Sequence, residues 1–196
     1  MARVTDPQKL EMIKRVTMEI MSESGYKDMT VSKIAKQSGV SAGYLYRHFE
    51  GKDDLISHLV DEYFELFNRQ LGHSLSESSS FKEIVHLYTT TLIEMANEDP
   101  VPIKFLGSLM SDHSFHKSRL ETDANAKIRD MASRVISNRT KTGELRQDMD
   151  IVDFVLFFIE MPLNYVNMRL NKAFNSEDLN KKEADKLTDM ITKALS

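Results

Sequence analysis

The chain has 196 residues, of which 41% are hydrophobic and 29% are charged, a composition typical of a folded globular protein. It contains no cysteine, which excludes disulfides, thiolate metal sites and a cysteine nucleophile and favours a reducing compartment. Its net charge is -4, but residues 1–55 hold nine Lys/Arg against eight Asp/Glu, so the acidity belongs to the remainder. With no signal-peptide pattern and no long uninterrupted apolar run, we expect a cytoplasmic protein without a membrane partner.

Helical periodicity and helix-ending residues account for nearly the whole sequence, and the alternation of strands is missing. The sequence therefore predicts an all-α fold of about nine helices. The first helix opens at Asp6 and Pro7, a capping side chain followed by proline at the first helical position, and ends at Gly25. Two short helices follow, at 30–38 and 41–49.

The fourth helix runs from Lys52 toward Leu71, with apolar residues three and four apart, and a serine-rich linker follows at 72–80. These features predict an N-terminal three-helix head and a larger helical bundle. The head is expected to span residues 1–51 and the bundle residues 52–196, with 52–75 as the connecting helix.

The C-terminal part shows further helix boundaries. Ser80 and Glu83 form a capping box, in which each side chain satisfies a free backbone N–H group of the other residue. Asp99 and Pro100 open the next helix, and a long polar helix runs from about 115 to 140.

Residues 151–174 separate into two apolar stripes when they are placed at about 100° per residue, and Pro162 predicts a kink. A helix that is apolar on two sides exposes one of them in a monomer, which predicts a homodimer. Which stripe faces the partner stays open. The residues assigned to the dimer interface, from one stripe and the last helix, are Val152, Leu156, Ile159, Leu163, Val166, Leu187 and Ile191.

Residues 30–52 have the pattern of a helix-turn-helix. Thr30 and Ser41 are good N-caps of two short helices, and Gly39 permits the positive φ of a tight turn between them. Leu45 and Phe49, four residues apart, would anchor the second helix to the core. The opposite face would then present Tyr44, Arg47 and His48, with Tyr46 alongside, as donors for phosphates and base edges.

This pattern resembles the N-terminal motif of TetR-family repressors over roughly residues 8–60. The resemblance rests on Thr30, Ile34, Ala35, Gly39, Val40, Ser41, Leu45, Tyr46, His48, Phe49 and Lys52. It implies that phosphates are contacted by Thr30, Tyr46, His48 and Lys52. It also implies that Ser41, Ala42, Gly43, Tyr44 and Arg47 lie in or beside the major groove.

The leading hypothesis is a homodimeric repressor that binds a near-palindromic operator in double-stranded DNA and is released by a small-molecule effector. An alternative is regulation by a protein partner or by dimer assembly alone, without a ligand. The residues assigned to an effector pocket are Tyr63, Phe67, His86, Met95, Phe105, Met110, Phe157, Glu160, Met161 and Asn164.

Catalysis and metal binding have weaker support. Glu83 and His86 have the spacing of a di-iron helix, but no second copy exists and the capping box already explains Glu83. His113 and His116 form a second candidate metal pair, without further ligands nearby. No P-loop, metalloprotease or nucleophile-elbow motif is present. We therefore predict a protein that is not an enzyme and that has no metal and no cofactor.

Overall fold

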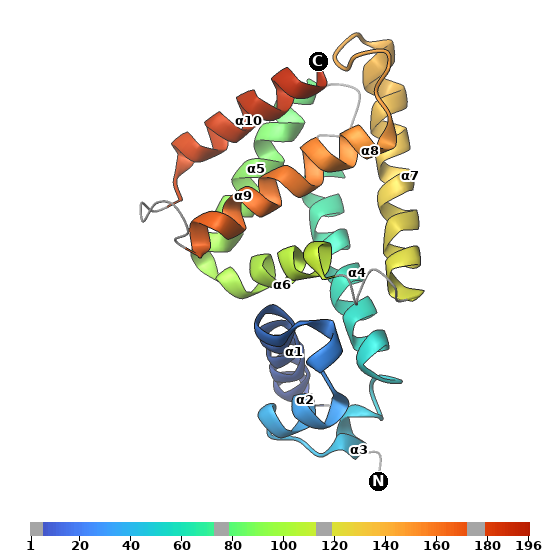
Figure 1. The fold of residues 1–196 in the computed structure, drawn as a ribbon, viewed down its shortest axis with the longest axis vertical. Coiled ribbons are helices and arrows are strands. Elements are labelled where there is room, and N and C mark those ends of the chain that lie inside the picture. Colours follow the sequence, from blue (N-terminus) through green and yellow to red (C-terminus); the bar gives the residue numbers. More distant parts are fainter. Residues whose placement is uncertain (1–5, 73–78, 113–118, 172–178) are drawn as a thin grey trace.

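The computed structural model describes residues 6–72, 79–112, 119–171 and 179–196 (Figure 1). These residues form helices and no strand, which confirms the all-α prediction. In chain order the elements are α1 (Pro7–Asp28), α2 (Val31–Gln37), α3 (Ala42–Leu45), α4 (Lys52–Gly72), α5 (Phe81–Glu98), α6 (Pro100–Ser111), α7 (Arg119–Lys141), α8 (Ile151–Phe154), the π-helical turn η1 (Val155–Glu160), α9 (Met161–Leu170) and α10 (Lys181–Leu195). Since α8, η1 and α9 are continuous, they form one rod.

The head consists of α1, α2, α3 and the first half of α4, at the lower end of Figure 1. Its core contains Ile13, Ile34, Leu45 and Leu55, all fully buried. Apolar side chains from all four helices thus share one small core, which holds the two short helices in place.

The body consists of α5, α7, the α8–η1–α9 rod and α10, which surround a second core. The predicted capping box at the start of α5 is confirmed. The Ser80 N–H donates to Glu83 Oε2 at 2.7 Å, and the Glu83 N–H donates to Ser80 Oγ at 3.3 Å. The bonds from the Ser80 backbone and side chain lower the pKa of Glu83 because they stabilise its charged form.

Helix α6 belongs to both cores. Phe105 and Leu109, 0% and 6% exposed, pack into the head core, whereas Ile103 packs into the body core. Gly107 lies buried against Asn167 of α9, whose amide donates to the Ile103 carbonyl at 3.1 Å. This helix therefore ties the head to the body, and Figure 1 shows it lying between them.

The α8–η1–α9 rod arranges its apolar residues differently from the two predicted stripes. Phe154 and Phe158 of one stripe and Leu163 and Val166 of the other are all buried in the body core. A π turn contains about one residue more than an α turn, so the residues after it are rotated by about 100°. The sequence predicts a kink at Pro162, and the irregularity that the structure shows is this π turn, which ends two residues before the proline.

The same rod, Ile151–Leu170, is long and apolar enough to cross a membrane by length and composition alone, and it is the one such helix among the described residues. Core helices pass the same test, and Phe154, Phe158 and Val166 lie in the core. The rod is therefore weak support for a membrane span.

Candidate nucleic-acid interface

The turn between α2 and α3 forms as the sequence predicts. Thr30 Oγ1 caps α2 by accepting the Lys33 N–H at 3.2 Å. Gly39 has a φ of 67°, and the Val40 N–H after it returns to the Ala35 carbonyl at 3.0 Å. A side chain at this φ would strain the backbone, so glycine is required in this turn.

Helix α3 is shorter than the predicted 41–49. Ser41 Oγ caps it by accepting the Tyr44 N–H at 3.1 Å, and regular α geometry ends at Leu45. Beyond it, the Arg47 and His48 N–H groups bond to carbonyls three residues back, at 3.3 and 3.0 Å. The chain thus tightens toward 3₁₀ geometry, which is common at the end of a helix. Phe49, 6% exposed, anchors the turn to the head core as predicted.

The predicted DNA-contacting residues lie together at the end of the head. Thr30, Ser41, Gly43, Tyr46 and Arg47 are exposed, and Tyr46 reaches 58% exposure despite its aromatic ring. Tyrosine is enriched at interfaces, because its ring offers apolar contact while its hydroxyl can bond to a partner. The half-buried members of the set are Ala42, Tyr44, His48 and Lys52.

Tyr44 is a correction to the sequence prediction, because its hydroxyl is buried and has no hydrogen-bond partner among the described residues. Its ring lies between polar groups, with the Arg47 guanidinium 5.0 Å and the Lys9 ammonium 5.9 Å from its centroid, and the His48 ring at 4.9 Å. Tyr44 thus holds cations at the surface through its ring face rather than presenting its hydroxyl. Sequence reasoning did not single out Lys9, since it lies on a different helix.

Lys52, at the start of α4, has partners within the protein. Its Nζ donates to the Tyr26 carbonyl at 2.9 Å and lies 3.9 Å from the centre of the Tyr26 ring. The Tyr26 hydroxyl donates to Asp53 Oδ1 at 2.8 Å. Burial and this carboxylate raise the pKa of Tyr26 to about 12. Sequence reasoning missed Tyr26, which shows no signal beyond following the helix-ending Gly25.

The residues assigned to an effector pocket have different surroundings among the described residues. Phe105 lies in the head core, Asn164 is exposed, and His86 lies outside the body core with Asp185 and Thr188 of α10 near its imidazole. Helical periodicity marks an apolar face without identifying its neighbours. Glu160 and Tyr63 are half-buried. The members of the assigned set that are half-buried and pack against the body core are Phe67, Met95, Met110, Phe157 and Met161.

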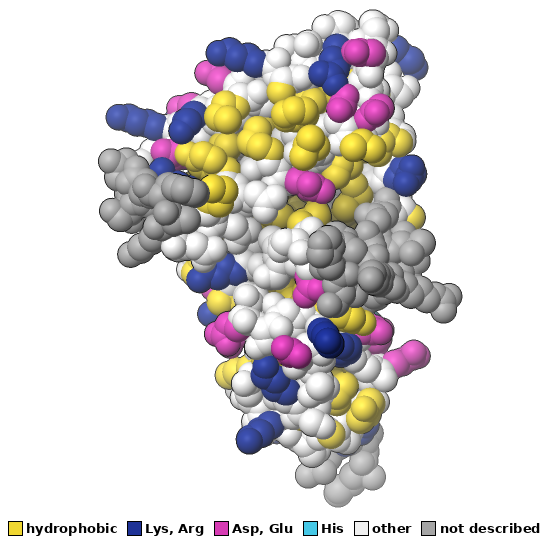
Figure 2. Space-filling model, viewed as in Figure 1, with side chains coloured by type: hydrophobic (Ala, Val, Ile, Leu, Met, Phe, Trp, Pro, Cys, Tyr) yellow, Lys and Arg dark blue, Asp and Glu magenta, His cyan; other side chains and the backbone are white. Residues whose placement is uncertain are grey.

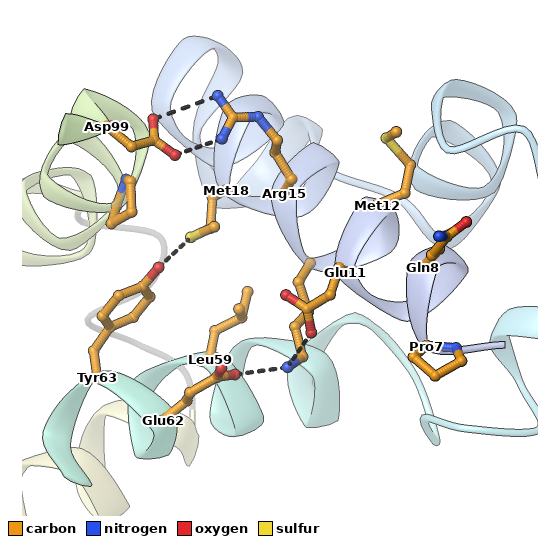
Figure 3. Close-up of a pocket in the computed structure, with 12 residues that line it drawn as sticks. Pro7, Gln8, Glu11, Met12, Arg15, Met18, Leu59, Glu62, Tyr63 and Asp99 are labelled. Carbon is orange, nitrogen blue, oxygen red and sulfur yellow. Dashed lines mark hydrogen bonds and ion pairs between the residues drawn. The ribbon is translucent and has the colours of Figure 1, made fainter. Parts of the chain in front are cut away.

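A cavity of about 590 Å³ lies between α1, α4 and the start of α6, and Tyr63 is its one lining residue from the predicted set (Figure 3). Salt bridges cross it: Lys14 to Glu62 at 2.8 Å, and Arg15 to Asp99. Tyr63 donates its hydroxyl to the Met18 sulfur at 3.4 Å, and burial raises the pKa of Tyr63 to about 12. This cavity lies beside the head core, which contains Met18 and Leu59 and against which Tyr63 packs.

The predicted dimer residues fall into two groups. Leu163, Val166, Leu187 and Ile191 are 0–3% exposed inside the protomer's own core, so a partner cannot contact them, which corrects this part of the prediction. The helical wheel failed here because η1 rotates the rod and the apolar face of α10 faces α5.

The remaining members of the predicted dimer set lie toward the surface. Val152 and Leu156 are 72% and 45% exposed, and Ile159 is half-buried. Met168 and Met190 are also exposed, at 47% and 45%. Figure 2 shows hydrophobic side chains gathered over this part of the body, where α8, α9 and α10 lie.

The candidate metal pairs find no support among the described residues. Glu83 is engaged in the capping box, and no group of three or more His, Asp or Glu side chains there is placed to hold a metal ion. His113 and His116 lie outside the described residues, as do residues 73–78 of the predicted linker.

The fold and the head define a class of protein: an all-helical chain with an N-terminal helix-turn-helix that exposes its second helix. Residues 13–59 match the family described as "Bacterial regulatory proteins, tetR family". This match confirms the resemblance found in the sequence over the head of the molecule.

One relative is the "Fatty acid metabolism regulator protein" of Bacillus subtilis (strain 168), which is 34% identical over 77 residues. The match covers 39% of each chain, so this chain spans well under two thirds of that relative. The named relatives are regulators rather than enzymes, in agreement with the prediction that this chain is not an enzyme.

Solved structures match over almost the whole chain and confirm the fold. A putative tetR family regulator from Shewanella sp. PV-4 has a TM-score of 0.74 at 16% identity, covering 95% of this chain and 97% of its own. The regulator FadR from Bacillus subtilis, solved in complex with stearoyl-CoA, has a TM-score of 0.67 at 19% identity, covering 95% and 99%. At such identities the likeness concerns the fold alone.

Proposed function

We propose that this chain is a sequence-specific, DNA-binding transcriptional regulator that acts in the cytoplasm as a homodimeric repressor. The observation that carries the proposal is the exposed end of the head, where Tyr46 and Arg47 project beside the capped start of α3. Hydroxyl and guanidinium groups bind phosphates and base edges, and the free N–H groups at a helix start favour phosphate. In this proposal Thr30, Tyr46, His48 and Lys52 contact phosphates, and Ser41, Ala42, Gly43 and Arg47 face the major groove.

The test is selection of bound sequences from random duplex DNA, followed by fluorescence anisotropy of the recovered duplex. We expect a near-palindrome whose half-sites are centred about 34–36 Å apart, one helical turn, as two recognition helices require. Arg47→Ala should weaken binding by about 1–3 kcal/mol at one base position and relax specificity there. Recovery of no sequence above the random background would refute the proposal.

The homodimer follows from the exposed apolar surface of Val152, Leu156, Met168 and Met190, which a monomer leaves in water. Two copies related by a twofold axis would cover this surface with itself. Leu156→Glu should therefore yield folded monomers in analytical ultracentrifugation. The matched variant Leu163→Glu, at a side chain 3% exposed, should unfold the protomer instead. A Leu156→Glu protein that remains dimeric would place the interface elsewhere.

We further propose that a small-molecule effector with an apolar part, bound in the body, releases the DNA. Support comes from the half-buried side chains Phe67, Met95, Met110, Phe157 and Met161, which border the body core rather than filling it. Methionine adapts its shape to apolar ligands at low cost. Since a structural neighbour was solved with stearoyl-CoA, this compound is the first probe. Binding to free protein without any change in operator affinity would favour the alternative, control by a protein partner or by dimer assembly.

A further inference from the structure

The end of α6 contacts the head where helix α1 is interrupted. Gly25 has a φ of 74°, which breaks the helix and turns the Tyr26 N–H away from it. This N–H donates to Asp112 Oδ2 at 2.7 Å. Asp112 is the residue that ends α6, where its own N–H bonds to the Ser108 carbonyl. Helix α6, which packs into both cores, therefore holds the backbone of the head at this break.

Glycine is required at this break for two reasons. Its φ lies in the left-handed region, which residues with a Cβ rarely adopt. A Cβ at Gly25 would also lie 2.8 Å from Asp112 Oδ2, closer than a carbon and an oxygen tolerate. The carboxylate of Asp112 and the backbone at Gly25 are thus fitted to each other.

Tyr26 carries this restraint to the start of α4. Its carbonyl and ring hold the Lys52 ammonium, at 2.9 Å and 3.9 Å, and its hydroxyl bonds to Asp53. An unrestrained lysine side chain carries about 2 kcal/mol of rotamer entropy, part of which is lost when it binds a phosphate. An ammonium has three N–H donors, so the bond to the Tyr26 carbonyl leaves others for DNA.

We infer that Asp112 is a positioning residue for DNA binding: through the Tyr26 N–H it fixes the carbonyl and ring that hold Lys52 toward a phosphate. The inference rests on the proposed function, since it assumes that Lys52 meets DNA. It adds that the end of α6, whose Phe105 and Leu109 pack in the head core, influences how strongly Lys52 binds a phosphate of the DNA. A purely structural cap would stabilise the head without acting through Lys52.

The test compares Asp112→Ala with wild type on the duplex recovered by selection, over a series of salt concentrations. We expect the dissociation constant to rise roughly three- to tenfold, with a shallower salt dependence, because a phosphate contact is weakened. In the Lys52→Ala background, Asp112→Ala should have little further effect, since residues that act through one contact are not additive. Circular dichroism establishes that each variant is folded.

Three further variants sharpen the test. Asp112→Asn keeps an acceptor oxygen for the Tyr26 N–H and should restore most of the affinity. Gly25→Ala, which displaces the carboxylate, should behave like Asp112→Ala. The matched control is Ser111→Ala, whose exposed hydroxyl bonds within its own helix to the Gly107 carbonyl at 3.0 Å and should leave binding unchanged.

The outcomes separate this inference from the proposed function. If wild type binds the duplex and Asp112→Ala binds equally well, or if its loss is undiminished in the Lys52→Ala background, the positioning role is overturned and the regulator remains. If wild type binds no duplex, both are overturned.

Discussion

The crossing of α6 and α9 predicts that Gly107→Ala destabilises the protein, although alanine is the better helix former by about 1 kcal/mol. A Cβ at Gly107 would lie 2.0 Å from Asn167 Nδ2 and 2.8 Å from its Cγ. The amide must then leave its site, where Nδ2 donates to the carbonyls of Ile103 and Leu163 at 3.1 and 3.2 Å.

The net effect follows from three contributions. Overpacking costs about 1–3 kcal/mol, each lost hydrogen bond costs about 1 kcal/mol, and helix propensity returns about 1 kcal/mol. Since two hydrogen bonds are lost, we expect a net loss of about 2–4 kcal/mol, which lowers the Tm by roughly 4–16 °C in a chain of this size. Thermal unfolding followed by circular dichroism measures it.

The control is Gly43→Ala, where the nearest atom to an added Cβ is Ser41 Oγ at 4.0 Å, so that the Tm should stay level or rise. Combining Gly107→Ala with Asn167→Ala should recover part of the lost stability, because the methyl group then has room. A rise in Tm for Gly107→Ala alone would refute the reasoning, since the crossing would then be loose enough to accept a side chain.

Three further predictions concern the head and its junction with the body. Phe105→Ala, at a side chain 0% exposed, should lower the free energy of unfolding by about 3–5 kcal/mol in a denaturant titration; a loss below about 1 kcal/mol would contradict its place in the head core. Tyr46→Phe should weaken binding to all duplexes alike without altering the salt dependence, and a changed base preference in a binding-site selection would assign Tyr46 to the groove. Burial raises the pKa of Asp99, but the hydrogen bond and charge of Arg15 outweigh it and lower the pKa. The stabilisation from Asp99 is therefore present above its ordinary pKa of about 3.9 and lost as the pH falls through the lower folded value. Asp99→Asn should be less stable than wild type at neutral pH and equal to it in strong acid, and a gap independent of pH would refute this.

The head could be read from the sequence because its signals are local. The caps at Thr30 and Ser41, the turn at Gly39 and the anchors Leu45 and Phe49 each act within four residues, and each lies where it was expected. The surroundings of Tyr44 could not be read in this way, because they include Lys9, a residue of another helix.

For the body, the sequence predicted where the helices lie along the chain, but it predicted less well which side of each helix is buried. Periodicity locates an apolar side but not the helix that covers it, and α10 illustrates this limit. Its apolar face, with Leu187 and Ile191 at 0% exposure, covers α5 within the protomer rather than a second copy. The polar link from Asp112 to Tyr26 joins residues 86 positions apart, so no sequence window contains both.

The rod Ile151–Leu170 shows how one backbone irregularity decides which surface is left for a partner. With uninterrupted α geometry, Leu156 and Leu163 would share a stripe, seven residues and about two turns apart. Leu156 lies within the π turn η1 and Leu163 follows it, so the extra residue of the turn rotates Leu163 about the helix axis relative to Leu156. Leu163 therefore lies in the core at 3% exposure, whereas Leu156 is 45% exposed. The N-terminal part of one predicted stripe is thereby joined on the surface by Met168, which belongs to the other. A dimer surface made of both stripes follows from the π turn, and a helical wheel drawn at a constant angle cannot represent it.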